Sequence, residues 1–174
     1  MSNFCVFTRR RAVFAAFALT AGLFGAMAIF SPLAEADTPS PWAKFVGNWR
    51  GTGEVIDSDG TREHISCRGK YSTSSGGEAL TLSVRCASDS YSFDIGSYLV
   101  ASGNSVSGDW QEYSRKIEGH VTGRVGDGLL EGSIAGASFT AETTVRISGR
   151  KQTLSLRTKG AQTVRAEVSL TREN

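Results

Sequence analysis

The spacing of two cysteines gives this sequence its clearest chemical signal. Cys67 and Cys86 lie in stretches that alternate apolar and polar residues, separated by residues 72–77. If Gly76-Gly77 forms a two-residue hairpin turn, the numbers of facing residues add to 153, as those of the two cysteines do. Directly opposed residues place their Cα atoms about 5.5 Å apart, within disulfide range. We therefore predict a Cys67–Cys86 disulfide, with a buried pair of free thiols as the alternative.

The titratable residues form no pattern that is typical of an enzyme. His64 and His120 occupy the polar register of alternating stretches, which favours surface histidines over a haem or metal ligand. Asp109 and Glu112 fall on opposite faces of one stretch, so they cannot act on one substrate. Residues 37–174 also lack the G-x-S-x-G, H-E-x-x-H, Walker and C-x-x-C motifs. These observations predict a non-enzymatic protein with no cofactor and no metal site.

The first 36 residues read as an export signal. Arg9–Arg11 precede an apolar run over residues 12–30, and Ala34-Glu35-Ala36 offers small residues for cleavage. This order predicts a signal peptide over 1–36, cut between Ala36 and Asp37. The alternative is an uncleaved anchor, because the run is just long enough to span a bilayer. We expect the domain in the periplasm or outside the cell, without a stable membrane anchor; the export route stays open.

Charge argues against nucleic acid as a partner. The chain has 19 Lys and Arg against 17 Asp and Glu. Three of these arginines and one glutamate lie in residues 1–36, so residues 37–174 carry 16 charges of each sign. A neutral domain without a basic patch has no electrostatic footprint for nucleic acid or anionic lipid.

The remainder of the chain has the period of β-strands. No proline occurs after residue 41, and short turn-forming links separate the alternating stretches, which predicts an antiparallel meander. Before the first strand, Trp42, Phe45 and Val46 have helical spacing and predict one short leading helix. The expected strands cover residues 48–57, 61–71, 78–88, 90–100, 104–113, 116–126, 128–134, 138–148, 151–159 and 162–172.

Glycines inside these strands favour a barrel over a sandwich. Strand interiors avoid glycine unless a sharp bend or a close backbone approach requires it, and closing a meander requires such bends. We predict one all-β domain over 37–174, an up-and-down barrel of about 8–10 strands. The glycines concerned are residues 51, 53, 69, 96, 108, 119, 123 and 132.

The segment F-V-G-N-W-R-G-T-G at residues 45–53 resembles the G-x-W opening of lipocalin-like (calycin) barrels. It is most similar to the G-x-W-x-G-x-G opening of nitrobindin-type haem barrels. The resemblance implies that Trp49, between Gly47 and Gly51, closes one barrel end while Arg172 or Arg165 stacks on its indole. Those barrels ligate haem through a histidine near the start of the last strand, where this chain has Thr163, so the resemblance does not extend to haem.

The inward registers suggest a binding protein. Phe93, Trp110 and Phe139 could line a pocket or simply fill the core, and many other inward positions are Gly, Ala or Ser, which favours a cavity. We therefore predict that the barrel binds a small apolar or amphipathic ligand. The alternative is a barrel with no internal ligand that contacts a protein of the envelope. Small bacterial protease-inhibitor barrels, which also combine an early G-x-W with one disulfide, are a fainter resemblance of that kind. The sequence names no protein partner.

Overall fold

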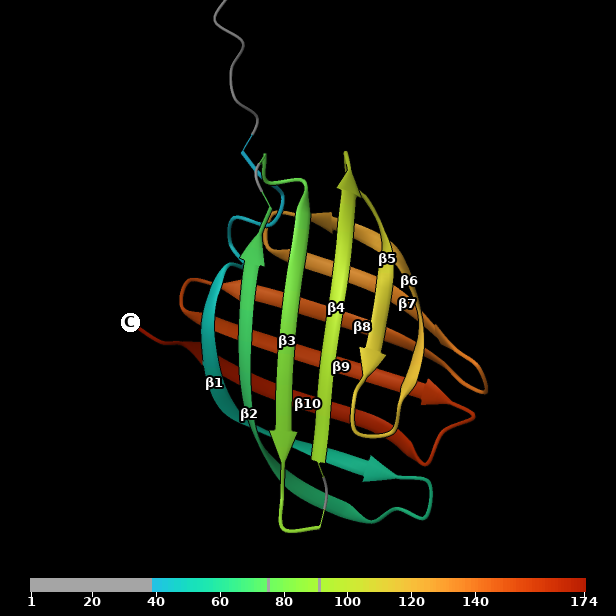
Figure 1. Ribbon diagram of the computed structural model, residues 1–174. Helices are drawn as coiled ribbons and strands as arrows, with labels where there is room; N and C mark the ends of the chain where they lie inside the picture. Colours follow the sequence, from blue (N-terminus) through green and yellow to red (C-terminus); the bar gives the residue numbers. More distant parts are fainter. Residues whose placement is uncertain (1–38, 75, 91) are drawn as a thin grey trace, which may run out of the picture. The chain divides into compact units, whose positions relative to one another are not determined.

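The computed structural model describes residues 39–74, 76–90 and 92–174 (Figure 1). The expected signal peptide and its cleavage site at Ala36 and Asp37 therefore lie outside the described residues. Among the residues that are described, none belongs to a helix long and apolar enough to cross a membrane.

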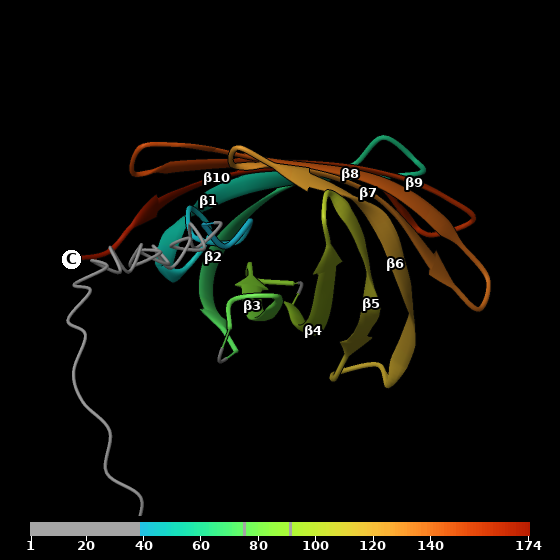
Figure 2. The same cartoon turned by 90° about the horizontal axis from the view of Figure 1, so that it is seen from above.

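Ten antiparallel strands form one closed barrel. Each strand pairs with the next in the chain, and β1 pairs with β10 to close the ring (Figures 1 and 2). The prediction of an all-β up-and-down barrel is confirmed, and every expected strand end lies within two residues of the observed one. The strands are β1 (Gly47–Asp57), β2 (Arg62–Thr73), β3 (Ala79–Ala87), β4 (Ser92–Ser102), β5 (Ser105–Glu112), β6 (Ile117–Gly126), β7 (Leu129–Gly136), β8 (Thr140–Ser148), β9 (Lys151–Lys159) and β10 (Thr163–Arg172).

The short leading helix was a wrong prediction. Residues 41–45 form a turn, in which the Trp42 carbonyl accepts hydrogen bonds from the backbone N–H groups of Phe45 (2.8 Å) and Val46 (3.3 Å). Strand β1 then begins at Gly47, whose φ is 139°. The apolar spacing is helical, but one turn fixes many dihedral angles for few hydrogen bonds and no room remains to extend it.

Glycines on the inner face explain why the sheet closes. A Cβ atom on Gly51 would lie 2.8 Å from the Leu170 Cα atom, and one on Gly108 would lie 2.8 Å from the Leu99 Cα atom. At Gly123 the corresponding distance, to the Gly132 Cα atom, is 2.7 Å. Real Cβ atoms essentially never approach other atoms within 3.0 Å. The bends of the barrel therefore require glycine at these positions.

The two ends of the barrel differ. One end, called the closed end, holds the turn before β1 and the β2–β3, β4–β5, β6–β7 and β8–β9 loops. Trp42, Phe45, Trp49 and Leu80 are all at most 1% exposed there. The opposite end, called the far end, holds the β1–β2, β3–β4, β5–β6, β7–β8 and β9–β10 loops. In Figure 2, β7–β10 form a gently curved wall, and β2–β6 bend round to complete the barrel.

Candidate functional site

The predicted disulfide is present. Cys67 of β2 lies directly opposite Cys86 of β3, with Cα atoms 4.1 Å apart, and their sulfur atoms are bonded. The register is the one expected from the turn, in which Gly76 and Gly77 both have positive φ angles of 91° and 74°. Both cysteines are buried on the inner face, so the bond ties β2 to β3 from within the barrel.

Trp49 lies in the packing that fills the closed end. Its indole Nε1 donates a hydrogen bond to the Phe45 carbonyl over 2.9 Å. The Arg172 guanidinium carbon lies 4.7 Å from the ring centroid, so of the two arginines considered it is Arg172 that stacks on the indole. A Cβ atom on Gly47 would lie 3.2 Å from Arg172 Cδ, whereas Gly51 admits the backbone of β10. The two glycines beside Trp49 therefore serve different neighbours.

A buried polar pair also lies at the closed end, and sequence reasoning missed it. Gln152 Nε2 donates a hydrogen bond to the Tyr71 hydroxyl over 2.9 Å, and the two residues are only 1% and 5% exposed. Burial raises the pKa of the Tyr71 phenol. The signal was the inward register of β9, where a glutamine precedes Leu154 and Leu156 by even steps.

The inner face is less buried toward the far end. Residues that pack on the core but keep part of their surface exposed are Leu82, Val84, Phe93, Ile134, Phe139, Leu154 and Ala166. Buried inward residues also occur in the far-end halves of the strands; they include Val55, Ile65, Cys86, Trp110 and Ala141. An inner wall whose apolar side chains keep part of their surface exposed is typical of a barrel with room for a small molecule.

The three aromatic residues predicted to line a pocket occupy two places. The rings of Trp110 and Phe139 are in contact, with centroids 5.6 Å apart, and Trp110 Nε1 donates to the Ala135 carbonyl over 3.2 Å. Phe93 instead lies under Arg115, whose guanidinium carbon is 5.2 Å from the centroid of the Phe93 ring. The structure brings Trp110 and Phe139 together on the wall, while Phe93 belongs to the rim of the far end.

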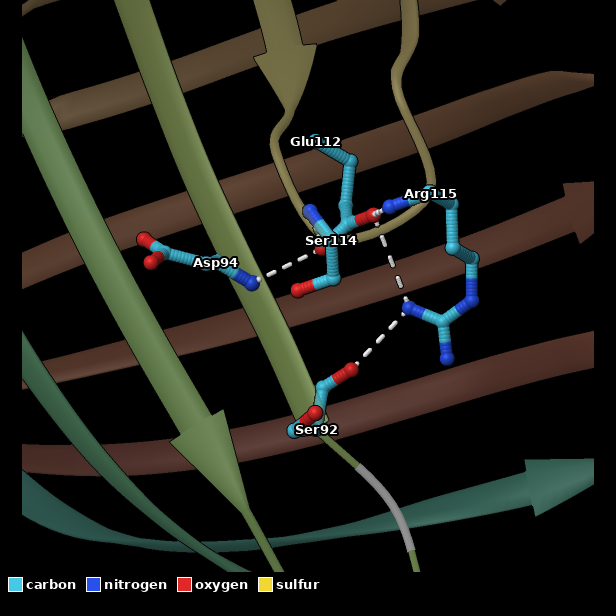
Figure 3. A network of polar contacts seen from close by, with 5 residues as sticks. All are labelled: Ser92, Asp94, Glu112, Ser114 and Arg115. Carbon is cyan, nitrogen blue, oxygen red and sulfur yellow. Dashed lines mark hydrogen bonds and ion pairs between the residues drawn. The ribbon is translucent and has the colours of Figure 1, made fainter.

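A buried carboxylate organises that rim (Figure 3). Glu112 is 2% exposed, and its Oε1 accepts hydrogen bonds from the backbone N–H groups of Asp94 (3.0 Å) and Ser114 (3.2 Å). Its Oε2 accepts one from the backbone N–H of Arg115 over 2.7 Å, and the Arg115 guanidinium also binds the Ser92 carbonyl over 3.0 Å. Burial opposes ionisation of Glu112, but these backbone hydrogen bonds outweigh it and lower its pKa. Glu112 is therefore a structural carboxylate that fixes the β5–β6 turn.

Replacing Glu112 should give a pH-dependent loss of stability. A carboxylate with a lowered folded pKa stabilises the protein above its ordinary value of 4.5, and this stabilisation disappears as the pH falls through the folded value. We expect Glu112→Gln to lower the free energy of unfolding by about 1–3 kcal/mol near neutral pH, because one backbone donor loses its charged acceptor. Urea unfolding should show this difference shrinking in acid. Glu118→Gln, exposed on the same hairpin, is the matched control. If Glu112→Gln lost as much stability in acid as at neutral pH, or if both variants lost the same amount, this role would be contradicted.

A groove of about 570 Å³ crosses the outer face of β3–β6. One side is the outward row Thr81, Tyr98, Asp109 and His120, and the other is the outward row Ser83, Gly96, Gln111 and Glu118. Between them runs the inward-facing row Leu82, Ser97, Trp110 and Gly119. Tyr113 completes the lining from the β5–β6 turn. Sequence reasoning, which placed the binding site inside the barrel, did not find this groove.

The residues present do not fit a haem inside the barrel. His64 is exposed, and the His120 side chain is 80% exposed and bound through Nδ1 to Asp109 over 2.5 Å on the outer face. Thr163, the residue compared above with a haem-ligating histidine, donates its hydroxyl to Asp57 over 2.9 Å. Within the described part of the chain, no group of three or more His, Cys, Asp or Glu side chains is placed to hold a metal ion.

Comparison with known proteins supports the fold and goes no further. No protein-family model and no curated protein matches the chain. Among solved structures, Rv2717c from M. tuberculosis is similar with a TM-score of 0.62 and 17% identity, over 79% of this chain and 99% of that one. A DUF3598-family protein of unknown function from Nostoc punctiforme has a TM-score of 0.54 and 19% identity; the match spans 75% of this chain and only 48% of that one.

A third similar structure is the S-type phycobiliprotein lyase CPES from Guillardia theta. Its TM-score is 0.51 with 12% identity, over 75% of this chain and 89% of that one. At these identities the likeness establishes architecture alone. The chain is a ten-strand closed barrel, an architecture similar to that of these three proteins.

Proposed function

We propose that this protein binds a small apolar or amphipathic molecule inside the barrel, reached through the far end. The observation that carries the proposal is the difference in burial along the inner wall. Aromatic side chains fill the closed end, whereas Leu82 and Leu154, near the middle of their strands, and Ile134, nearer the far end, stay partly exposed. When a ligand covers apolar side chains that water reaches, the buried apolar surface lowers the free energy of the complex.

The chemistry of the carboxylates supports a binding role over a catalytic one. Asp109 lies on the outer face with His120, and Glu112 faces the interior with both oxygens bound by backbone N–H groups. The two carboxylates therefore belong to different surfaces of one strand. We propose that the protein is a binding module that works in the periplasm or outside the cell.

Filling the inner wall should weaken binding. We expect 1-anilinonaphthalene-8-sulfonate to bind saturably to the wild type, with a rise in dye fluorescence. Leu154→Trp should weaken this binding about tenfold or more, because the larger side chain occupies the proposed site. Thr153→Trp is the matched control, since Thr153 is the exposed neighbour on the same strand and should leave binding unchanged.

A second, smaller substitution keeps the test valid if Leu154→Trp does not fold. Ala166→Leu adds less volume at another partly exposed inward position and should also weaken dye binding. If both filled variants unfold at the wild-type temperature and still bind the dye as the wild type does, the internal site is wrong.

Export should leave a defined mature end. We expect the intact mass of protein recovered from the producing cell's periplasm or medium to correspond to a chain beginning at Asp37, because Ala34 and Ala36 provide the small residues for cleavage. Ala36→Lys should block processing. Recovery of an uncut chain in the membrane fraction would contradict the proposed location.

A further inference from the structure

The outer groove over β3–β6 has features of a second binding site, independent of the barrel interior. Two tyrosines in its lining are unusually exposed for aromatic residues, Tyr98 at 52% and Tyr113 at 55%. Exposed aromatic rings beside a hollow are a common mark of a binding surface. Here they lie beside Gly96, whose lack of a side chain lets the Tyr113 ring pack against the strand.

The position of Tyr113 is fixed by the rim. Its backbone N–H donates to the Asp94 carbonyl over 2.8 Å, and Glu112, its neighbour, holds the same turn from inside. The Tyr113 ring then lies over Gly96, where a Cβ atom would come within 2.9 Å of its Cε2 atom. The ring is thus placed before any ligand arrives, which lowers the entropy cost of binding.

The charge of the groove is negative. Asp109 and Glu118 contribute two carboxylates, and no lysine or arginine occurs among the described residues that line it. Lys70 lies in the same cross-strand row but on β2, one strand beyond the lining. The Arg115 guanidinium turns away toward Glu112 and Phe93. The Asp109 carboxylate is bound by His120, while the Glu118 carboxylate has no side-chain hydrogen bond or ion pair in the described part of the chain.

We propose that this groove binds an organic ammonium ion, with a quaternary ammonium group as the best fit. The negative face of a tyrosine ring attracts a cation, and a weakly hydrated quaternary ammonium loses little on leaving water. The preplaced Tyr113 ring, the exposed Tyr98 ring and two carboxylates around one hollow supply both attractions. The small, hydroxylated outward neighbours Thr81 and Ser83 leave room for methyl groups and can accept a hydrogen bond from a ligand hydroxyl.

Choline and its neutral isostere 3,3-dimethylbutan-1-ol test the proposal directly. The two molecules have the same shape and differ in charge, so NMR titration of the full mature chain separates cation recognition from simple apolar contact. We expect choline to shift the Tyr98 and Tyr113 ring signals saturably. The isostere should bind at least about fivefold more weakly than choline. Equal binding of the two, or no saturable shift with choline, would overturn the proposal.

Substitutions test whether choline binding depends on the tyrosine ring or its hydroxyl, and on a carboxylate inside the groove or one outside it. Tyr113→Phe should keep binding, because the ring face is retained, whereas Tyr113→Leu and Tyr98→Leu should each weaken choline about fivefold. Glu118→Gln should weaken it as well, while Glu131→Gln, an exposed carboxylate of β7 outside the groove, should not. Undiminished binding in folded Tyr98→Leu and Tyr113→Leu would overturn the assignment.

A second experiment, with lipid vesicles, distinguishes an ammonium group carried by a lipid from one carried by a free solute. If the group belongs to a lipid, the protein should sediment with phosphatidylcholine vesicles, and free choline should release it. If it is a free solute, choline should bind without any retention on vesicles. Binding at the barrel interior is read separately with the dye, because the filled variant Leu154→Trp should leave choline binding intact.

Discussion

Replacing Trp49 with alanine should lower the free energy of unfolding by about 3–5 kcal/mol, the usual cost of truncating a fully buried aromatic side chain. Trp49 is 1% exposed and is bound at its Nε1 by the Phe45 carbonyl. Its loss would leave a cavity at the closed end and would also remove the ring under Arg172. A domain at the lower end of the usual range of about 5–15 kcal/mol would retain little stability, whereas one at the upper end would stay folded. Urea or thermal unfolding measures the change.

Comparison with two variants shows that the effect belongs to the ring. Trp49→Phe should lose less, because it keeps an aromatic body for Arg172 while giving up one hydrogen bond. Arg172→Lys should lose less again, since the ring stays in place. A Trp49→Ala protein that unfolds at the wild-type midpoint would show that the closed end does not depend on this residue.

Removing the Cys67–Cys86 disulfide should cost about 3 kcal/mol, because the bond closes a loop of sequence separation 19 in the unfolded chain. The double variant Cys67→Ser, Cys86→Ser should therefore melt earlier while retaining the barrel's circular dichroism spectrum. Treatment of the wild type with a reductant should reproduce the shift and have no effect on the variant. Two free thiols in native, exported protein would contradict the pairing.

Features that depend on period and local turns were predictable from the sequence. The Cys67–Cys86 pairing followed from strand alternation and one Gly-Gly turn, since antiparallel register is determined once the turn is placed. The inner glycines, such as Gly108 and Gly123, were recognised because a strand interior tolerates glycine only where backbones meet. Both inferences use residues close together in the chain.

Features assembled from several hairpins were not predictable. The groove requires outward residues of β3, β4, β5 and β6 to align in rows, and it requires Tyr113 to fold back over Gly96 from a turn. Glu112 was identified only as a residue on the opposite face from Asp109. Its role depends on three backbone N–H groups that converge at the rim, and no sequence pattern specifies them.

Intermolecular nuclear Overhauser effects between the bound naphthalene dye and the methyl groups of the protein test the internal site most directly. The account predicts contacts from the dye to Leu82, Ile134 and Leu154, which are partly exposed on the inner wall, and none to Val100, which is exposed on the outside. Contacts confined to outer residues such as Val100 or Tyr98, with none to the three inner side chains, would contradict it.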